Sequence, residues 1–517
     1  MPEPALAYSP AHDTLAWQEV RSAGVLLHIS SLPSPFGIGD LGAHAYKFAD
    51  QLAQAGQRFW QILPLNPTNA GAGESPYFSS SAFAGNPLLI DLISLRQEGL
   101  LEDADLNFPC DLNPHDVDFS RVRPLKLAAI RKAAARLVAR GLPDDFNDWR
   151  ESQSHWLDDY ALFTEIERLY PDQSWSDWPE ALRDRHSAAL QAIREQHAHA
   201  LLETEVFQYF FFSQWQRLKT YCNQQGLLLF GDMPIYVSYD SSDVWSNPDL
   251  FKLDSSKRPT MVSGVPPDYF SETGQLWNNP VYDWDALKAS GYQWWVERMQ
   301  ALFARFDIVR IDHFRGLVQF WEVPADSETA IGGSWQDVPT YDFFDTLYRA
   351  NPDFPVVAED LGLITPDVVE VKDHYRLPGM LVLHFAFYDD NQDNPYKPEN
   401  HSSRALVYLG THDNTTTRAW LDEADDTIRN RYQRYLEQDE NPLAMSSMLS
   451  LLMRSDANIA IVSAQDLLDL PVRARMNNPS TPSGNWSWRL SPEEYQKIAF
   501  DDLAQLTRRN QRWWPTS

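Results

Sequence analysis

Cysteine, long apolar runs and clustered basic charge are all scarce in this 517-residue sequence. Its two cysteines, Cys110 and Cys222, lie far apart and match neither a CxxC motif nor a metal-ligand spacing, which favours a reducing compartment. No apolar run approaches the roughly 18 residues that a membrane span requires. The N-terminal residues lack the basic and apolar regions of a signal peptide. We therefore predict a soluble, cytoplasmic protein.

The charge balance argues against anionic partners. Acidic residues outnumber basic ones by 72 to 43, which gives a formal net charge of −29, and no basic cluster interrupts this excess. Such a field repels nucleic acid and anionic lipid, because both present many negative phosphates. We predict no nucleic-acid or membrane partner and expect a neutral or cationic ligand.

The HExxH, P-loop and GxSxG motifs are also missing, and two segments only imitate a ligand site. "GIGDLG" (Gly37–Gly42) fits GxGxxG, but the next predicted strand ends "ILPLN", without the acid that dinucleotide binding requires. "DDNQDN" (Asp389–Asn394) resembles the start of a calcium loop, but Asn394 replaces the required glycine and Asn400 the bidentate glutamate. We predict a tight turn and a solvated acidic loop, with no cofactor and no metal.

Eight short segments have the character of buried strands. They are continuously apolar and rich in β-branched residues, which is typical of parallel strands covered on both faces. Helical patterns lie between several of them, so the succession predicts an α/β fold of the (β/α)8 TIM-barrel type. The predicted strands are Gly24–Ile29, Phe59–Pro64, Gly226–Pro234, Asp307–Asp312, Pro355–Asp360, Met380–Phe387, Ala405–Asp413 and Asn458–Asp466.

The spacing of these strands is uneven. About 160 residues separate the second from the third, far more than a simple crossover needs, and they contain helical patterns such as "LKLAAIRKAAARLVARG". We predict a large, mainly helical insertion there, forming a subdomain over about residues 92–205, and further loop insertions elsewhere. A single catalytic barrel domain is expected over residues 21–517, after an extension over residues 1–20 for which no ordered structure is predicted.

Acidic residues stand at or near the carboxyl ends of five predicted strands. In a (β/α)8 barrel these ends and the loops after them form the rim that carries the active site. Any single aspartate there has an ordinary structural explanation, because it can cap the next helix or close a turn. Five acids on one rim are harder to explain by caps alone, and we predict a functional site around Asp232, Asp312, Glu359, Asp413 and Asp466.

The segment "VRID" (Val309–Asp312) places two charged side chains in a predicted buried strand. Side chains alternate along a strand, so Arg310 and Asp312 point to the same face. The guanidinium favours an ionised carboxylate and is expected to lower the pKa of Asp312, as a nucleophile requires. Neighbouring strands lie about 4.8 Å apart, so the Glu359 carboxyl is expected about 5–5.5 Å from that of Asp312, the separation of retaining glycosidases. We infer that Asp312 attacks an anomeric carbon and that Glu359 protonates the leaving oxygen.

Long motifs extend over nearly the whole chain, from about Gly24 to Leu490. In order they read "LLHISSLPSPFGIGDLG", "ESPYFSSSAFAGNP", "GDMPIYV", "DVWSNPDLF", "GVPPDYFSETGQLWNNPVYDW", "VRIDHFRG", "AEDLG", "GTHDN" and "GNWSWR". With this ordered set the chain resembles the 4-α-glucanotransferases of glycoside hydrolase family 77, the amylomaltases or disproportionating enzymes. The resemblance implies that an α-1,4-glucan segment moves from a maltooligosaccharide, starch or glycogen-derived donor to the 4-OH of an acceptor glucose or glucan. It implies a retaining double displacement that needs no cofactor.

The resemblance also implies roles at matching positions. Asp312 is expected to be the nucleophile, Glu359 the general acid and base, and Asp413 the group that stabilises the transition state. Arg310 and His412 are expected to orient these three carboxylates. The sugar subsites are expected to be lined by Ser75, Tyr77, Asp232, Asp268, Gln275, Trp277, His313, His384 and Asn485, with Tyr77 as a stacking platform.

Four places depart from the family pattern, and one of them, "NNPSTPSG" (residues 477–484), lacks a glycine often found after its first proline. Asn278 replaces a glycine in "LWNNP", within a loop over about residues 236–290 that the resemblance predicts to cover the cleft, so the loop's backbone freedom is expected to change. Thr415 follows "GTHDN" where the family often has aspartate, and Ala72 stands where some members carry an aromatic residue that guides long glucans. None of these positions belongs to the carboxylate trio, so they bear on chain-length preference and not on the reaction.

Two other functions stay open at this point. A plain α-glucan hydrolase would use the same retaining carboxylates, and only its products would distinguish it. A non-catalytic glucan-binding protein could also occupy a degenerate barrel, but the intact Asp312, Glu359 and Asp413 speak against it.

Overall fold

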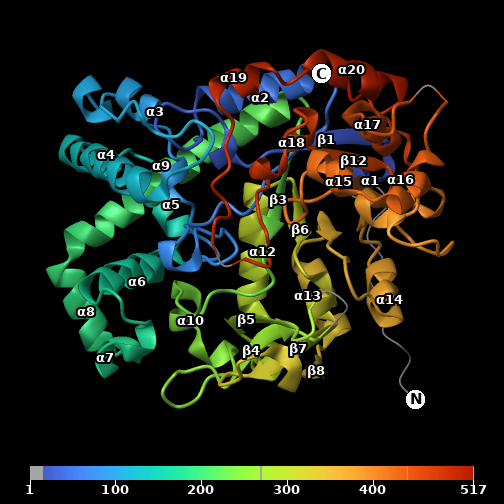
Figure 1. Ribbon diagram of the computed structural model, residues 1–517. Coiled ribbons are helices and arrows are strands. Elements are labelled where there is room, and N and C mark those ends of the chain that lie inside the picture. Colours follow the sequence, from blue (N-terminus) through green and yellow to red (C-terminus); the bar gives the residue numbers. More distant parts are fainter. Residues whose placement is uncertain (1–15, 268–270, 439, 482, 516–517) are drawn as a thin grey trace.

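The computed structural model describes residues 16–267, 271–438, 440–481 and 483–515. Eight parallel strands form one sheet in the spatial order β10, β11, β12, β1, β2, β3, β6, β9, and helices surround it (Figure 1). These strands are β1 (Ser22–Leu26), β2 (Phe59–Gln61), β3 (Leu228–Met233), β6 (Ile308–Ile311), β9 (Val356–Ala358), β10 (Gly379–Val382), β11 (Ala405–Tyr408) and β12 (Ile459–Ser463).

The two end strands of this sheet meet and almost close it into a barrel. At the end of β9, the Ala358 amide donates to the carbonyl of Pro378, directly before β10, at 2.9 Å. Each of the other neighbouring strand pairs is parallel. The architecture is therefore a (β/α)8 TIM barrel, and the predicted fold class is confirmed.

Five of the barrel strands are buried along their whole length and the other three at all but one residue, which explains their apolar character. Every residue of β1, β2, β6, β9 and β11 is buried. One face of each strand meets the barrel interior and the other meets the helices, so neither face can be polar without a paired group. The charged residues Arg310 in β6 and Asp232 in β3 are the exceptions that the site has to explain.

All eight observed strands end before their predicted bounds, and two of them run directly into a helix. Strand β10 is followed directly by a 3-10 helix, Leu383–Phe387, and β12 by the short helix α18, Ala464–Leu467. Apolar residues continue into both turns because the turns also pack against the core, so hydrophobicity does not mark the strand end. Asp466 consequently lies on α18 and not at the end of a strand.

The chain between β2 and β3 is largely helical and lies to one side of the barrel (Figure 1). Helix α9 connects this layer to the barrel, since it packs against α4 and α6 and also against β3. The extent of a separate subdomain, about residues 92–205, stays a prediction. The helices of the segment are α3 (Leu92–Gln97), α4 (Phe119–Arg140), α5 (Phe146–Ser152), α6 (Leu157–Leu169), α7 (Glu180–Arg183), α8 (Ser187–Gln196) and α9 (Ala198–Gln224).

A second, antiparallel sheet was not predicted from the sequence. Its strands follow the order β5, β4, β7, β8, and it lies at the lower edge of the molecule in Figure 1. Strands β4 (Met261–Val265) and β5 (Gln275–Pro280) belong to the segment after β3, whereas β7 (Gln319–Pro324) and β8 (Ser334–Asp337) follow β6. The segment predicted as a covering loop thus contains part of a sheet.

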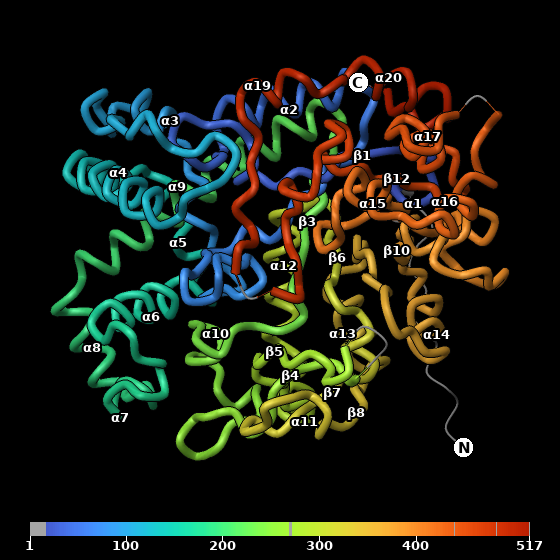
Figure 2. Tube along the Cα trace, viewed as in Figure 1, coloured from blue at the N-terminus to red at the C-terminus, as the bar shows by residue number. Residues whose placement is uncertain are grey.

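The C-terminal chain returns across the barrel and ties distant segments together (Figure 2). Ser487 accepts a backbone hydrogen bond from Val117 at 2.7 Å, and Arg489 donates one to His115 at 2.9 Å. Helix α20 packs against α2 and α17. The remaining helices are α1 (Ala16–Glu19), α2 (Ala43–Gln54), α10 (Ser242–Ser246), α11 (Trp284–Ala289), α12 (Gln293–Arg305), α13 (Thr340–Ala350), α14 (Pro366–His374), α15 (Thr417–Glu423), α16 (Asp426–Gln433), α17 (Met445–Arg454), α19 (Pro492–Gln496) and α20 (Phe500–Arg509).

Two predictions concern the chain ends and membranes. Residues 1–15 of the predicted extension lie outside the described residues. Among the helices that the structure describes, none combines the length and the apolar character needed to span a bilayer.

Candidate active site

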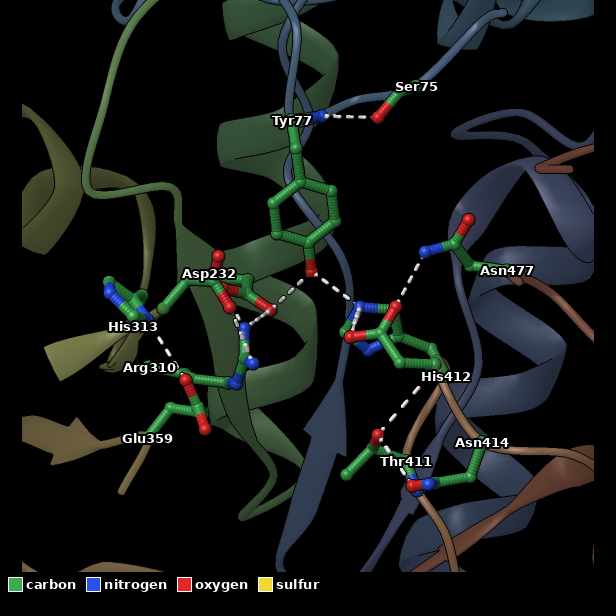
Figure 3. Close-up of polar contacts among 12 residues, drawn as sticks. Ser75, Tyr77, Asp232, Arg310, His313, Glu359, Thr411, His412, Asn414 and Asn477 are labelled. Atoms are coloured by element: carbon green, nitrogen blue, oxygen red, sulfur yellow. Dashed lines mark hydrogen bonds and ion pairs between the residues drawn. The ribbon is translucent and has the colours of Figure 1, made fainter. Parts of the chain in front are cut away.

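Charged side chains meet at the carboxyl ends of three adjacent strands, β3, β6 and β9 (Figure 3). Asp232 lies in β3 and Arg310 in β6, where the two residues are register partners. Asp312 directly follows β6, and Glu359 directly follows β9. The strand order therefore brings together three acids that are far apart in the sequence.

Arg310 binds two carboxylates at once. Its Nη1 donates to both oxygens of Asp232, at 2.9 and 2.8 Å, and its Nη2 lies 2.7 Å from Oδ1 of Asp312. Burial lowers the pKa of Arg310, but Asp232 and Asp312 outweigh this and hold it well above its usual value. Arg310 is thus a fixed positive charge whose planar donors set the orientation of both carboxylates.

Asp312 is the partner of Arg310 that keeps an open side. Its side chain is 29% exposed, whereas that of Asp232 is fully buried. Burial raises the pKa of Asp312, Arg310 opposes the rise, and Asp232 and Asp413 add to it. The predicted lowering of this pKa is therefore wrong in its net direction, because burial and neighbouring acids outweigh the guanidinium. The exposed side leaves room for a ligand to approach.

Glu359 is held by backbone amides and not by a cation. Its Oε2 accepts from the His313 N–H at 2.7 Å and its Oε1 from the Leu361 N–H at 2.8 Å. Burial raises the pKa of Glu359 to about 7; Arg310 and the two amides oppose the rise, and Asp312 adds to it. Since Arg310 contacts Asp312 directly, Asp312 loses its proton first and Glu359 keeps one near neutrality.

His313 shapes the turn between these two acids. Its backbone is left-handed, with φ of 52°, which is uncommon for a residue other than glycine and directs its N–H toward Glu359. Its ring meets Trp277 edge-on, with 4.7 Å between ring centroids. Burial lowers the pKa of His313 to about 3, so the imidazole is neutral.

Asp413 is positioned by the C-terminal segment. Asn477 Nδ2 donates to its Oδ1 at 2.6 Å, and Arg475 Nη2 donates to its backbone carbonyl at 2.6 Å. Its Oδ2 lies 3.4 Å from Nε2 of His412. The sequence did not single out Asn477 or Arg475 as site residues. The one available signal was the motif "NNPSTPSG", which begins at Asn477.

Tyr77 connects the two sides of the rim. Its hydroxyl donates to Asp232 Oδ2 at 2.8 Å and lies 2.9 Å from Nε2 of His412, on which its ring also stacks (Figure 3). Burial, with a contribution from Asp232, raises the pKa of Tyr77. Ser75 Oγ accepts the Tyr77 N–H at 3.3 Å and fixes the start of this turn. Tyr77 is therefore a hydrogen-bond bridge between Asp232 and His412, and its role as a stacking platform stays a prediction.

The covering segment contributes Gln275 and Trp277 from β5. Trp277 Nε1 donates to Gln275 Oε1 at 3.1 Å, so the two predicted residues lie together. Asn278 next to them has φ of 64°. A glycine adopts this conformation without strain, and asparagine is among the few other residues that tolerate it, which accounts for the substitution. Asp268 of the same segment lies outside the described residues.

The other predicted residues are engaged within the protein. His384 is 1% exposed, stacks on Trp420 and lies 3.0 Å from Thr417 Oγ1. Asn485 Oδ1 accepts from the Asn478 N–H at 2.9 Å. Asp466 accepts from the Thr417 N–H at 2.9 Å, so this acid holds the first residue of α15, whose N-cap is Thr416.

The two imitated ligand motifs have structural explanations. A side chain at Gly39 would come within 2.0 Å of the Ile29 carbonyl, so the glycine permits a tight turn. In "DDNQDN", Asp389 accepts hydrogen bonds from Asn391 and Asn394, which closes the loop on itself. Across the described ranges, no group of three or more His, Cys, Asp or Glu side chains is arranged to hold a metal ion.

Comparisons with known proteins agree with this geometry. The profile of glycoside hydrolase family 77, described as 4-alpha-glucanotransferase, matches residues 27–495. A 4-alpha-glucanotransferase of Streptococcus pneumoniae is 43% identical over 495 residues, covering 94% of this chain and 96% of its own. One of Thermus thermophilus is 43% identical over 487 residues, covering 92% of this chain and 95% of its own.

Two solved structures are similar as well. An amylomaltase from Streptococcus agalactiae, in complex with acarbose, has a TM-score of 0.91 at 36% identity, covering 95% of this chain and 100% of that one. An amylomaltase from Corynebacterium glutamicum has a TM-score of 0.79 at 16% identity, covering 97% and 77%, and its likeness concerns the fold alone.

Proposed function

The chain belongs to the 4-alpha-glucanotransferase family, glycoside hydrolase family 77, and we propose that its rim transfers α-1,4-glucan segments to the 4-OH of an acceptor glucose or glucan. One observation carries the proposal. Asp312 is oriented by Arg310 and open on one side, while Glu359 nearby has its pKa raised to about 7. Two carboxyls in such different environments suit the nucleophile and the acid of a retaining mechanism.

In the first step Asp312 attacks the anomeric carbon of the donor. The bond from this carbon to the glycosidic oxygen breaks as the bond to the aspartate oxygen forms, and Glu359 gives its proton to the leaving oxygen. The released glucan carries this proton on its new 4-OH, and a glycosyl-enzyme ester remains on Asp312. Arg310 supports the step because it holds Asp312 in one orientation.

The second step reverses these bond changes with a different sugar. Glu359, now ionised, takes the proton of the acceptor 4-OH, and the acceptor oxygen displaces Asp312 from the anomeric carbon. Asp413, oriented by Asn477, holds sugar hydroxyls while positive charge develops on the ring. Two inversions at one carbon return the original α configuration.

The proposed substrates are neutral sugars. Maltooligosaccharides and starch or glycogen-derived α-1,4-glucans act as donors, and glucose or a shorter glucan acts as acceptor. Contacts with the sugar come from Ser75, Tyr77, Asp232, Asp268, Gln275, Trp277, His313, His384, His412 and Asn485. The protein works in the cytoplasm, a proposal supported by two cysteines that are both unpaired.

Incubation with maltotriose tests the reaction. Transfer produces glucose together with maltodextrins longer than maltotriose, and the number of reducing ends stays constant. A hydrolase with the same carboxylates would give only shorter products and new reducing ends. Products of the second kind alone would refute the proposed transfer.

A further inference from the structure

A cavity of about 990 Å³ lies in the outer helical layer, away from the rim. It follows one face of α9 from Tyr209 to Gln224, with α12 on one side and α5 on the other. At 1.5 Å per helical residue this face is about 22 Å long. None of the proposed catalytic or sugar-binding residues is among the described residues that line it.

Aromatic rings form one wall of this groove. Trp149 of α5 meets Tyr209 and Phe212 of α9, with ring centroids 5.4 and 6.2 Å apart. All three rings are half-buried, so each packs on one side and keeps a surface toward the cavity. Amphipathic rings in this state suit the weakly apolar faces of sugar rings.

Amide side chains supply the polar part of the lining. Gln153 lies in the loop after α5, Gln216 on α9, and Gln293 and Gln300 on α12. Each amide offers both donors and an acceptor, as sugar hydroxyls do. Groups of this kind on three sides of a groove favour a ligand that is rich in hydroxyls.

The charge of the lining points to a neutral ligand. The ionisable carboxylates Asp145 and Glu297 are balanced by the guanidinium groups of Arg217 and Arg305, although the whole chain carries a net charge of −29. Arg217 is already paired with a carboxylate, and Arg305 is buried against the Phe212 ring. A balanced lining offers neither an anion nor a cation a net attraction.

We propose that this groove is a second glucan-binding site, which holds several glucose units of a long α-1,4-glucan away from the rim. Its volume is at the upper end of the about 300–1,000 Å³ that is usual for small-molecule sites. The inference rests on the proposed function, because that function makes a neutral glucan the protein's own substrate. A glucan held there raises the local concentration of its other segments near the rim, so the site acts on long glucans and not on maltotriose.

Three substitutions test the site. Ala304→Trp on α12 fills the groove from an exposed position without removing any packing, and Trp149→Ala removes one ring. Ala135→Trp on the exposed side of α4, outside the groove, is the matched control. Each is made in the full chain with Asp312→Asn, which prevents turnover, and retention in native gels containing glycogen gives the dissociation constant.

Both groove variants are expected to weaken glycogen binding by about threefold or more, which corresponds to the loss of one ring contact, while Ala135→Trp binds normally. With Asp312 restored, all three are expected to disproportionate maltotriose within about twofold of the parent. Equal retention of glycogen by all variants overturns the proposal. So does a change in sedimentation mass without a change in retention, since the occupant is then a second copy of the chain. Failure of the parent to transfer maltotriose refutes the proposed function instead, and leaves glycogen retention as a separate result.

Discussion

At the rim Arg310 is buried between Asp232 and Asp312, and at the junction of α4 with the loop before α2 Lys126 is buried beside Asp40. Lys126 is fully buried, lies 3.7 Å from Asp40 Oδ2 and donates to the Leu88 carbonyl at 2.6 Å. Asp40, only 8% exposed, also accepts from its own loop. The difference is the open side of Asp312. The buried Lys126, whose partner Asp40 is enclosed, holds two chain segments together. The buried Arg310, whose partner Asp312 is partly exposed, orients a side chain that can react.

The Arg310 ion pairs at the rim and the Lys126–Asp40 pair at the junction also differ in the protonation of their members. Burial raises the pKa of Asp40 to about 6 although Lys126 opposes the rise, and burial lowers the pKa of Lys126. At the junction both partners are thus pushed toward neutrality. At the rim two carboxylates keep Arg310 charged. This fixed positive charge lies beside Asp312, so Asp312 ionises while Glu359 keeps its proton.

Removing the open partner at the rim is the strongest test of this comparison. Asp312→Ala is expected to lower kcat by about 10⁴-fold or more, because no other group forms the glycosyl ester. The free energy of unfolding should change little, since Asp312 is partly exposed and Arg310 keeps both bonds to Asp232. Product formation from maltotriose and urea denaturation measure the two effects. Undiminished product formation would remove Asp312 from the mechanism.

The second test concerns the proton on Glu359. The rate of transfer should fall above about pH 7, where Glu359 loses its proton, and fall again at low pH, where Asp312 gains one. Glu359→Gln is expected to lower kcat by about 10²–10⁴-fold and to abolish the fall on the alkaline side. Profiles of kcat/KM against pH for both proteins check this. An unchanged alkaline fall in the variant would assign it to another group.

The third test breaks the junction. Lys126→Met leaves Asp40 buried without its cation and should lower the free energy of unfolding by about 3–5 kcal/mol, with activity per folded molecule unchanged. Asp40 has a folded pKa of about 6, above its usual value, so its contribution to stability is full in acid and is lost as the pH rises through about 6. Without Lys126 this pKa rises further, and the deficit should be largest above pH 6.

Urea denaturation at pH 5 and pH 8 measures this dependence. Arg96→Met removes an exposed ion pair with Asp103 and serves as the control, with an expected loss below about 1 kcal/mol. A deficit of the same size at both pH values would mean that Asp40 does not titrate as described. Lost activity in a folded Lys126→Met variant would show that the Lys126–Asp40 pair is not purely structural.

The smallest expected effect is at Asn477. Asn477→Ala removes the bond to Asp413 Oδ1 and is expected to lower kcat about tenfold with little change in KM, because Asp413 acts as charge develops. Steady-state kinetics with maltotriose separate the two constants. A change in KM alone would make Asn477 a sugar contact and not a positioning residue.

The sequence predicted the barrel well because its strands are buried on both faces. Runs such as Ala405–Tyr408 are apolar at every position, which few other structures require. The ends of the strands were predicted less accurately, since the turn Leu383–Phe387 is as apolar as the strand before it. Strands β4 and β5 were missed because they are partly exposed and contain glycine, asparagine and proline, so their composition does not differ from that of a loop.

The sequence predicted which charged residues form the site, but not their pKa values. The charges of "VRID" identified the strand, because a buried strand has no other use for them. The pKa of Asp312 depends on how much solvent the fold removes, and no local pattern reports that. The bond from Asn477 to Asp413 joins positions 64 residues apart, and only the returning C-terminal segment brings them together.

The most direct measurement is to identify the residue that carries the sugar during the reaction. An α-glucosyl fluoride needs no acid to leave, so Glu359→Gln should form the ester and then turn over slowly. Intact mass spectrometry is expected to show one added glucosyl unit, and peptide mapping to place it on Asp312, with no adduct in a variant that also carries Asp312→Asn. A glucosyl unit on any other residue, or no adduct while transfer proceeds, would show that Asp312 is not the nucleophile.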